Sequence, residues 1–474
     1  MIWVVLALLI FIFQIATILI AEFRHPSKAM AWLLILFVFP VIGFVMYYFL
    51  ARSFQRRRIV RQRRIISEET RLEALRRSRL LHRPEDLGSG EFREQERMFA
   101  LLQQFSLPIT GCNTTQVLNN GETTYASILE AIAAARHHVH VEYYTVRDDR
   151  VGRRFQRALL DKLREGAEVR LIYDGIGSYE LSAAYVRELE EAGAQVQCFL
   201  APRIAFFDKR INYRNHRKIV VVDGIVGFVG GINVGDEYVG GNKRLGFWRD
   251  THLRIEGDAV YSLQEVFMRD WWFTARERLT DSRYLPEHGC VGEDQVQLVS
   301  SGPDAGPDAI VQSVFAALAV AKRRIYITTP YFVPDKGVLM GLKTAAASGV
   351  DVRLILPYVA DTRLVMLASL SYVEELLLAG ARVYRYHKGF IHSKVMIVDG
   401  LLGSVGSANM DLRSFYSNFE LNALLFDTRT IEELAQTFMD DLDDCHEIRL
   451  AEFAARPRLQ KAGEIAARML SPLL

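Results

Sequence analysis

Two histidines and two lysines recur in the same arrangement in two parts of this 474-residue chain. Residues 216–233 read HRKIVVVDGIVGFVGGIN, and residues 392–409 read HSKVMIVDGLLGSVGSAN. Each copy holds His-x-Lys, an Asp five residues after the Lys, and a Gly-[Gly/Ser]-x-Asn segment. Repetition of this kind indicates a duplicated architecture. Two imidazoles, two ammonium groups and two Asn-bearing loops together favour a site for an anionic phosphodiester.

These residue types predict covalent phosphoryl chemistry. Lys218 and Lys394 would neutralise the oxygens of the phosphate. The side-chain amides of Asn233 and Asn409 would assist them. One histidine would attack phosphorus, and the other would exchange protons with the departing and incoming alcohols, because imidazole titrates near neutrality. A covalent intermediate makes the group available to an acceptor other than water.

A nucleophilic histidine needs a hydrogen-bond acceptor for its other ring nitrogen, and two carboxylates are candidates. Asp250 follows His216 in the segment FWRDTHLRIEG. Glu420 follows His392 in SNFEL at a comparable separation. We therefore expect Asp250 to orient His216 and Glu420 to orient His392, with surface salt bridges as the alternative for both carboxylates.

Short buried strands are expected to carry the motifs. Residues i and i+2 of a strand face the same side, so His216 and Lys218 would project together, as would His392 and Lys394. The runs 219–222 and 395–398 are apolar and rich in β-branched residues, as in strand interiors.

An Asp-Gly pair follows each of these runs, at Asp223 and Asp399, and predicts a tight turn. These two aspartates of the motif lie far along the strand from the histidines. We therefore expect them to be structural, binding a Lys or the turn backbone.

The repeat extends beyond the motifs. Apolar stretches at 139–146, 167–175 and 194–199 correspond to those at 324–333, 350–358 and 381–386, with helical stretches between them. Such alternation predicts two α/β halves with a largely parallel sheet. We place the halves at 111–290 and 291–474, packed about a pseudo-twofold axis with the site at their interface.

The N-terminal region predicts a membrane anchor. Residues 2–21 and 29–50 carry no charge, and each is about 20 residues long, the length of a helix that spans a bilayer. We expect a transmembrane hairpin over 1–51; a cleaved signal peptide is the alternative for its first helix, although a basic n-region is missing. A basic and linker segment at 52–110 follows, with seven arginines at 52–64 that place the catalytic region in the cytoplasm.

The C-terminal stretch 459–474 has apolar residues at helical spacing. It predicts an amphipathic helix that lies either on the membrane surface or on the protein itself.

The cysteines and the remaining histidines do not indicate a metal site. The four cysteines show no paired spacing, which argues against a disulfide scaffold or a zinc site and fits a reducing compartment: Cys112, Cys198, Cys290 and Cys445. His137, His138 and His140 begin a strand, and His-x-Lys is not a metal motif because Lys is not a normal zinc ligand. We expect no metal and no organic cofactor.

The duplicated motif resembles that of the phospholipase D superfamily. The segments NYRNHRKIVVVDG, FWRDTHLRIEG, ITTPYFVPD and RSFYSNFEL make the chain similar to bacterial cardiolipin synthases over essentially its whole length. The resemblance implies transfer of a phosphatidyl group between two phosphatidylglycerol molecules, with release of glycerol, at the bacterial inner membrane. It implies His216 as nucleophile, His392 as general acid, and a catalytic set that also includes Lys218, Asp223, Lys394 and Asp399.

Three alternatives stay open at this point. A hydrolytic phospholipase D would use water as acceptor. A phosphodiesterase of nucleic acid should have basic residues around its site, whereas here the densest cluster lies beside the expected membrane anchor, so nucleic acid is not an expected partner. A catalytically silent membrane scaffold is disfavoured by the presence of both motifs. The sequence makes no prediction of oligomeric state.

Overall fold

The computed structural model describes residues 2–22, 26–50, 73–83, 86–87, 92–105, 107–200, 213–302 and 308–471. The arginine cluster at 52–64 lies outside the described residues, so the structure does not bear on it.

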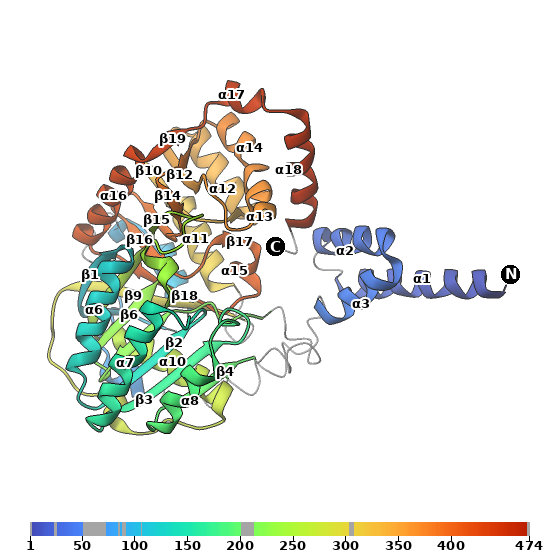
Figure 1. Cartoon of the computed structure of the whole chain (residues 1–474). Helices are drawn as coiled ribbons and strands as arrows, with labels where there is room; N and C mark the ends of the chain where they lie inside the picture. Colours follow the sequence, from blue (N-terminus) through green and yellow to red (C-terminus); the bar gives the residue numbers. More distant parts are fainter. Residues whose placement is uncertain are drawn as a thin grey trace.

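One sheet runs through the catalytic region (Figure 1). Its strand order is palindromic. From its edge to its centre, the first half contributes β4 (Gln195–Phe199), β3 (Glu168–Asp174), β2 (His138–Tyr143), β5 (Ile219–Val222), β6 (Val226–Gly230), β8 (Thr251–Gly257) and β1 (Ile109–Asn119). The second half repeats this order with β13 (Arg382–Tyr386), β12 (Asp351–Pro357), β10 (Arg324–Thr328), β15 (Val395–Val398), β16 (Leu402–Gly406), β18 (Glu420–Leu425) and β9 (Asp294–Ser301). β1 and β9 pair at the centre, and β19 (Cys445–Glu447) extends the edge beyond β13. The duplicated α/β fold therefore has the pseudo-twofold relation that the repeat predicts.

The expectation of a largely parallel sheet is wrong. Within this large sheet, each half has three neighbouring strands that are parallel, β2-β3-β4 and β10-β12-β13, and the other ladders of the sheet are antiparallel. The reason lies in the motifs, whose strands form the hairpins β5-β6 and β15-β16. Each hairpin loop has three residues, 223–225 and 399–401. Asp223 has φ 53°, Gly224 φ 68° and Asp399 φ 52°, positive values typical of tight hairpin turns.

Helices cover both faces of the sheet. In the first half α6 (Asn120–Ala134), α7 (Arg150–Arg164) and α8 (Ala183–Glu191) lie on one face and α10 (Ala259–Ala275) on the other. The motif strand shows the division residue by residue, because Val220 and Val222 join the core under α6 and α7, while Ile219 and Val221 join the core under α10. In the second half α11 (Ala309–Val320), α12 (Lys336–Ala347) and α14 (Val373–Leu378) oppose α16 (Thr428–Asp443).

Shorter elements complete the catalytic region. They are α5 (Glu96–Leu102), β7 (Phe247–Arg249), β11 (Phe332–Val333), α13 (Arg363–Leu370), β14 (Gly389–Ile391), β17 (Met410–Asp411), α15 (Leu412–Tyr416) and α17 (Leu450–Ala454). Among these, β7 and β14 matter most for the site, because they join the two halves.

The N-terminal region forms three helices rather than two: α1 (Ile2–Ala21), α2 (Pro26–Val38) and α3 (Pro40–Leu50). Proline has no N–H and clashes with the preceding turn, so Pro40 divides the expected second helix. α2 and α3 pack together, with the Trp32 and Tyr47 ring centroids 5.5 Å apart. Within the described ranges, no helix combines the length and the apolarity needed to cross a membrane.

Cys112 and Cys290 form a disulfide, which corrects the expectation of unpaired cysteines. They are 178 residues apart in sequence, and meet because Cys112 lies in β1 and Cys290 lies just ahead of β9, its neighbour in the sheet. Cys198 and Cys445 are free thiols.

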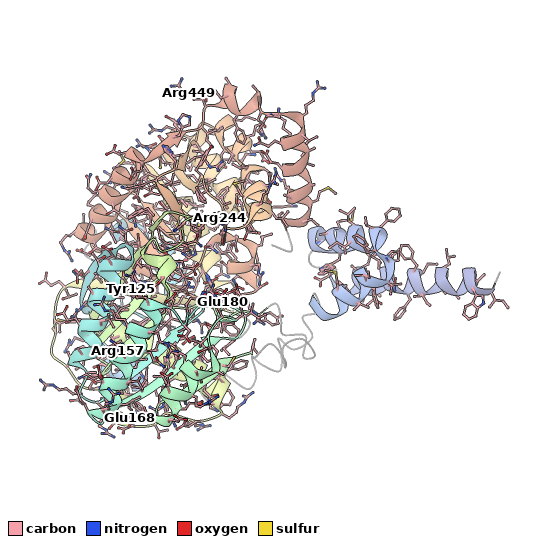
Figure 2. The ribbon with its side chains drawn as sticks, in the orientation of Figure 1. Tyr125, Arg157, Glu168, Glu180, Arg244 and Arg449 are labelled. Atoms are coloured by element: carbon pink, nitrogen blue, oxygen red, sulfur yellow. A yellow bond between two sulfur atoms is a disulfide. The ribbon has the colours of Figure 1, made fainter. Side chains whose placement is uncertain are left out.

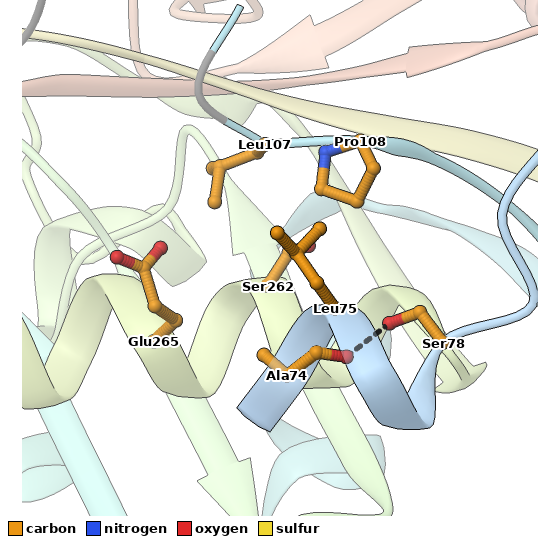
Figure 3. Close-up of a pocket in the computed structure, with 7 residues that line it drawn as sticks. All are labelled: Ala74, Leu75, Ser78, Leu107, Pro108, Ser262 and Glu265. Atoms are coloured by element: carbon orange, nitrogen blue, oxygen red, sulfur yellow. Dashed lines mark hydrogen bonds between the residues drawn. The ribbon is translucent and has the colours of Figure 1, made fainter. Parts of the chain in front are cut away.

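The segment before the catalytic region packs on α10 (Figure 3). Ala74, Leu75 and Ser78 face Ser262 and Glu265 across a cavity of about 10 Å³ that Leu107 and Pro108 close. A cavity of this size holds at most one water molecule, so it is not a substrate site.

The last helix, α18 (Arg458–Leu470), docks on the protein with one face only. Arg468 donates to the carbonyl oxygen of Ser371 at 3.1 Å, and Ala467 is buried. Leu459, Ile465 and Met469 are 89%, 62% and 53% exposed. Docking on the protein therefore leaves the apolar residues of the amphipathic pattern uncovered.

Candidate active site

The two motifs meet at the junction between the halves. His216 lies in the extended segment just before β5, and its backbone N–H donates to the carbonyl oxygen of Phe419 at 2.9 Å. His392 has the same place before β15, and its N–H donates to the carbonyl oxygen of Arg249 at 2.7 Å. Each histidine is thus anchored to the residue that precedes the candidate carboxylate of the other half.

Further contacts hold this junction together. β14, which leads to His392, pairs in parallel with β7. Arg244 in the first half donates to the carbonyl oxygens of Ala360 and Asp361 in the second at 3.2 and 3.3 Å, and Figure 2 shows it between the two halves. The site is therefore built on paired backbone from both repeats.

The histidine–carboxylate pairs are crossed. Nδ1 of His216 is 3.0 Å from Oε2 of Glu420, and Nδ1 of His392 is 2.8 Å from Oδ2 of Asp250. The expectation that Asp250 serves His216 and Glu420 serves His392 is wrong, because each half supplies the carboxylate for the histidine of the other half. Their role as partners of the histidines is nevertheless what the sequence predicts.

These contacts determine which ring nitrogen carries the proton. An ionised carboxylate only accepts hydrogen bonds, so Nδ1 of His216 and Nδ1 of His392 must each be the donor. In a neutral imidazole this leaves the lone pair on Nε2. Both histidines therefore have the tautomer that a nucleophile or a general base requires.

Burial keeps both imidazoles neutral. It lowers the pKa of His216 to about 4, against the opposing influence of Glu420. It lowers the pKa of His392 to about 3, where Lys394 adds to the effect and Asp250 opposes it. Lys394 also lowers the pKa of His216, and Lys218 that of His392, so each histidine lies within the field of the other motif's lysine.

The two lysines are buried beside the histidines. Nζ of Lys218 donates to the carbonyl oxygen of His216, and Nζ of Lys394 to that of His392, each at 2.6 Å. Burial lowers the pKa of Lys218 to about 7 and that of Lys394 to about 8. An anion bound between them would favour the charged forms, and this is the electrostatic property expected of a phosphate site.

Glu420 is held by a network of side-chain donors that the sequence did not reveal. Ser407 Oγ donates to Oε2 at 2.5 Å, and Ser414 Oγ and Asn418 Nδ2 donate to Oε1 at 3.0 and 3.2 Å. Burial alone raises the pKa of the Glu420 carboxyl, but His216, Lys218 and Ser407 outweigh burial and the pKa is lowered. Glu420 is thus kept ionised.

Asp250 is kept ionised in a similar way. Burial raises the pKa of its carboxyl, but His392, Lys394 and the N–H of Thr251 outweigh burial and lower the pKa. Trp248 precedes Asp250 by two residues, as Asn418 precedes Glu420, and its Nε1 lies 3.4 Å from Oδ2 of Asp250.

The Gly/Ser difference in the Gly-[Gly/Ser]-x-Asn segment follows from the two carboxylates. A Cβ atom added at Gly231 would lie 2.1 Å from Oδ1 of Asp250, so only glycine fits there. The longer Glu420 leaves room for Ser407 at the corresponding position, where its hydroxyl serves as a donor. The Gly/Ser difference, visible in the sequence, was the one signal that could have pointed to Ser407.

The two asparagines are placed differently. Oδ1 of Asn233 accepts from the N–H of Thr145 at 3.1 Å, and its Nδ2 donates to Tyr238 at 3.1 Å, so its amide is occupied by the protein. Oδ1 of Asn409 is buried without a hydrogen-bond partner among the described residues. An amide oxygen accepts hydrogen bonds, as phosphate oxygens do, and the Asn409 side chain also hydrogen-bonds Asp411. The expected assistance of the two asparagines to a phosphate therefore stays a prediction.

The two motif aspartates are structural, as their distance along the strand predicts, and their contacts do not support the catalytic role that the resemblance implies for Asp223 and Asp399. The Asp223 carboxylate accepts the backbone N–H groups of residues 136, 137 and 138 at 2.8 to 2.9 Å. The Asp399 carboxylate accepts those of residues 322, 323 and 324 at 2.7 to 2.8 Å. Each aspartate fixes the chain entering the neighbouring strand and lies at the end of the motif strand away from the histidine.

One group of potential metal ligands occurs among the described residues. His137, Glu168 and Asp281 offer ligand atoms within 4.8 Å of one another. Arg170 already binds Glu168, and Arg283 binds Asp281. The group lies where β2 and β3 begin, at the opposite end of these strands from His216. Figure 2 shows Glu168 at the far end of the first half. It contributes nothing to the histidine site.

A larger hollow of about 400 Å³ opens between α6 and α7. Its walls are mainly apolar and carry three charged groups, Glu122, Arg150 and Arg154. No motif residue lines it.

The affinity of the free protein for an anion should fall as the pH rises. Lys218 and Lys394 lose their protons through pKa values of about 7 and about 8, so the cationic site present at pH 6 is largely gone at pH 9. We expect sulfate, which keeps its charge in this range, to bind at least about tenfold more weakly at pH 9 by calorimetry. Lys218→Arg should flatten the profile because arginine stays charged; an unchanged profile would contradict the assignment.

Comparison with known proteins places this geometry in a family. The structure of phosphatidylserine synthase from Haemophilus influenzae Rd KW20 matches 80% of this chain and 100% of its own, with a TM-score of 0.62 at 12% identity, and so shares the fold. The duplicated fold with its paired motifs defines a phospholipase D-like enzyme. The family model described as "Cardiolipin synthase, PLD-like domain" matches residues 128–271 and 314–442, one segment in each half. A second model, "Phospholipase_D-nuclease N-terminal", matches residues 2–52.

Curated relatives cover nearly the whole chain. "Cardiolipin synthase 2" of Bacillus anthracis is 44% identical over 98% of this chain and 90% of its own. "Cardiolipin synthase" of Geobacillus kaustophilus is 44% identical over 97% and 91%, and "Major cardiolipin synthase ClsA" of Bacillus subtilis is 37% identical over 99% of both chains. The chain therefore belongs to the bacterial cardiolipin synthases of the phospholipase D superfamily.

Proposed function

We propose that this protein transfers a phosphatidyl group from one phosphatidylglycerol to another, forming cardiolipin and releasing glycerol. The observation that carries the proposal is the crossed arrangement itself: two neutral imidazoles, each with an Nε2 that has no hydrogen-bond partner among the described residues, beside two buried lysines. Two such nitrogens suit a double displacement, in which one forms a bond to phosphorus and the other moves protons. Family membership supports a second phospholipid as the acceptor.

In the first step, the lone pair on Nε2 of His216 attacks phosphorus, and the bond from phosphorus to the glycerol oxygen breaks. His392, once protonated, gives its Nε2 proton to the departing alkoxide. Its pKa of about 3 in the free protein means that the bound phosphate anion must favour the imidazolium. Glu420 stabilises the positive charge that develops on His216.

In the second step, Nε2 of His392 takes the proton from the hydroxyl of the acceptor phosphatidylglycerol. The resulting oxygen attacks phosphorus, and the bond from phosphorus to His216 breaks. Lys218 and Lys394 neutralise the phosphate oxygens in both steps. The cycle consumes no water and returns both histidines to their starting states.

We propose that residues 1–51 anchor the enzyme to the membrane, with 52–110 as connection and 111–290 and 291–474 as catalytic halves. The N-terminal helices support an anchor because they expose large apolar side chains: Trp3 81%, Phe13 66%, Ile20 75%, Phe37 76% and Val41 73%. Leu459 and Ile465 of α18 offer further apolar surface, and in Figure 1 α18 lies on the side of the catalytic region from which these helices project. Loss of membrane association on removal of 1–51 would support the anchor, and full retention would contradict it.

Two features make opposite predictions about the side of the membrane on which the catalytic halves lie. The arginines at 52–64 favour the cytoplasm by the positive-inside rule. The Cys112–Cys290 disulfide favours an oxidising compartment instead. We propose the cytoplasm; labelling of Cys290 in intact cells, after reduction, by a membrane-impermeant thiol reagent would overturn this.

The experiment that tests the function is a product analysis. The full-length protein in liposomes receives labelled phosphatidylglycerol, and lipids and water-soluble products are separated by mass spectrometry. We expect cardiolipin and free glycerol in equal amounts, absent with His216→Ala. Phosphatidic acid as the main product would show that water is the acceptor and would overturn the synthase while leaving the covalent step intact.

A further inference from the structure

A buried guanidinium contacts the backbone of each of the two residues whose carboxylates orient the histidines. Nε of Arg217 donates to the backbone carbonyl oxygen of Glu420 at 3.1 Å, and Nη1 of Arg249 donates to that of Asp250. Arg217 is 0% exposed and Arg249 5%. We propose that Arg217 and Arg249 are positioning residues that fix Glu420 and Asp250, and through them the Nε2 atoms of the two histidines. The inference rests on the proposed function and deepens it.

Arg217 connects the two halves at the first carboxylate. Its Nη2 donates to the carbonyl oxygen of Ser301 at 3.0 Å, and Ser301 is the residue of β9 that faces Glu420 of β18. Its Nη1 forms an ion pair with Asp270 of α10, in which both side chains are fully buried. One side chain of the first half thereby holds both strands at the end where Glu420 meets His216.

Arg249 has the same role at the second carboxylate. Its Nε donates to Asp441 of α16 at 2.7 Å. Its Nη1 also donates to Oγ1 of Thr251 at 3.0 Å and to Oγ of Ser393 at 3.3 Å. Ser393 stands between His392 and Lys394, so this guanidinium joins the carboxylate strand to the motif of the other half.

The two arginines occupy exchanged positions in the repeat. The residue between His and Lys is Arg217 in one motif and Ser393 in the other. The residue before the carboxylate is Phe419 in one pair and Arg249 in the other, and the guanidinium of Arg217 lies 5.4 Å from the Phe419 ring centroid. Each pair thus has one guanidinium and one aspartate from a covering helix, supplied from opposite sides. Both halves therefore share a guanidinium that donates to the backbone carbonyl oxygen of the carboxylate residue. They do not share an arginine at one fixed position of the repeat.

Stability alone is a weak reason for such pairs. Burying two charges costs about as much as their attraction returns, and apolar residues of similar size often stabilise a core equally well. Catalysis depends more strongly on these contacts, because a histidine is directed by its carboxylate and the carboxylate by its own hydrogen bonds. Removing the hydrogen-bond partners that orient metal-ligating histidines and carboxylates typically costs about 10- to 100-fold in activity, and we expect a loss of the same order here.

Arg217→Lys and Arg249→Lys test the proposal in the full-length protein. Lysine keeps the charge opposite Asp270 or Asp441, but its single ammonium cannot reproduce the forked contacts to the carbonyl oxygens. We expect kcat to fall about 10- to 100-fold in each variant, with KM changed less than about threefold. The rate is followed as release of glycerol from phosphatidylglycerol, a step that a synthase and a hydrolase share, so failure of the positioning role is distinguishable from failure of the proposed acceptor.

Arg170→Lys is the matched control. Arg170 is also a buried arginine, paired with Glu168 and bonded to Tyr284 at the opposite end of the sheet. We expect it to lower the melting temperature to a similar degree and to leave kcat unchanged. An unchanged kcat in folded Arg217→Lys would overturn the proposal, as would an equal loss of kcat in Arg170→Lys.

A second variant keeps the test decisive if the lysine variants do not fold. Arg217→Ser combined with Phe419→Arg transplants the Ser393 and Arg249 arrangement into the first pair. We expect the combination to recover at least about tenfold of the kcat lost in Arg217→Ser alone. A folded double variant with no recovery would show that the guanidinium does not act through the carboxylate and would overturn the inference.

Discussion

His216→Ala and His392→Ala should each lower phosphatidyl transfer by at least about 10³-fold while the protein stays folded and membrane-bound. The size of the effect follows from the geometry, since each crossed carboxylate orients one imidazole among the described residues. Neither Nε2 can replace the other, because one must bond phosphorus while the other carries a proton. The measurement is the rate of cardiolipin formation in liposomes, with His446→Ala, at an exposed position of β19, as control.

The same variants separate the roles of the two histidines. A phosphatidyl donor with a nitrophenol leaving group does not need protonation, so the variant that lacks only the general acid should still form the covalent intermediate. We expect mass spectrometry to find a phosphatidyl group on His216 in the His392→Ala protein and none on His392 in the His216→Ala protein. The reverse pattern would exchange the roles, and robust cardiolipin synthesis in either variant would remove the two-histidine mechanism.

The duplicated fold could be predicted because its strands and turns follow from residue patterns within short segments of the sequence. The strands expected at 167–175 and 350–358 are β3 and β12, and the Asp-Gly pairs form the turns that fix Asp223 and Asp399. These features depend on contacts between residues close in sequence. The same turns also imply antiparallel hairpins at β5-β6 and β15-β16, so the sequence itself contains a pattern that opposes a largely parallel sheet.

The crossed pairing could not be predicted because spacing within a half carries no information on contacts between halves. Asp250 is closer in sequence to His216 than to His392, yet the backbone ladder that positions it, β7 with β14, joins residues more than a hundred positions apart. The Cys112–Cys290 disulfide has the same origin, since it arises from the central pairing of β1 with β9. The Gly231/Ser407 difference is one trace of this arrangement in the sequence.

Glu420→Gln should lower kcat by about 10²- to 10⁴-fold, with a much smaller effect on KM. Every neighbour of this carboxylate is a donor: Ser407 and His216 at Oε2, and Ser414 and Asn418 at Oε1. A glutamine must present an amide NH₂ to one of these pairs. If the NH₂ faces His216, Nδ1 has to become an acceptor, and the proton moves to Nε2, where it blocks the attacking lone pair.

The crossed geometry makes a prediction that no arrangement within one half shares. Glu420→Gln should change the reactivity of His216 toward diethylpyrocarbonate, mapped by mass spectrometry, and leave that of His392 unchanged; Asp250→Asn should do the opposite. Glu464 is a buried glutamate of α18 that forms an ion pair with Arg456, and Glu464→Gln should affect neither histidine. If Glu420→Gln instead changed the modification of His392, each carboxylate would serve the histidine of its own half, and the crossed pairing would be wrong. Because each carboxylate comes from the other half, neither repeat alone can hold an oriented histidine, and the chemistry requires both.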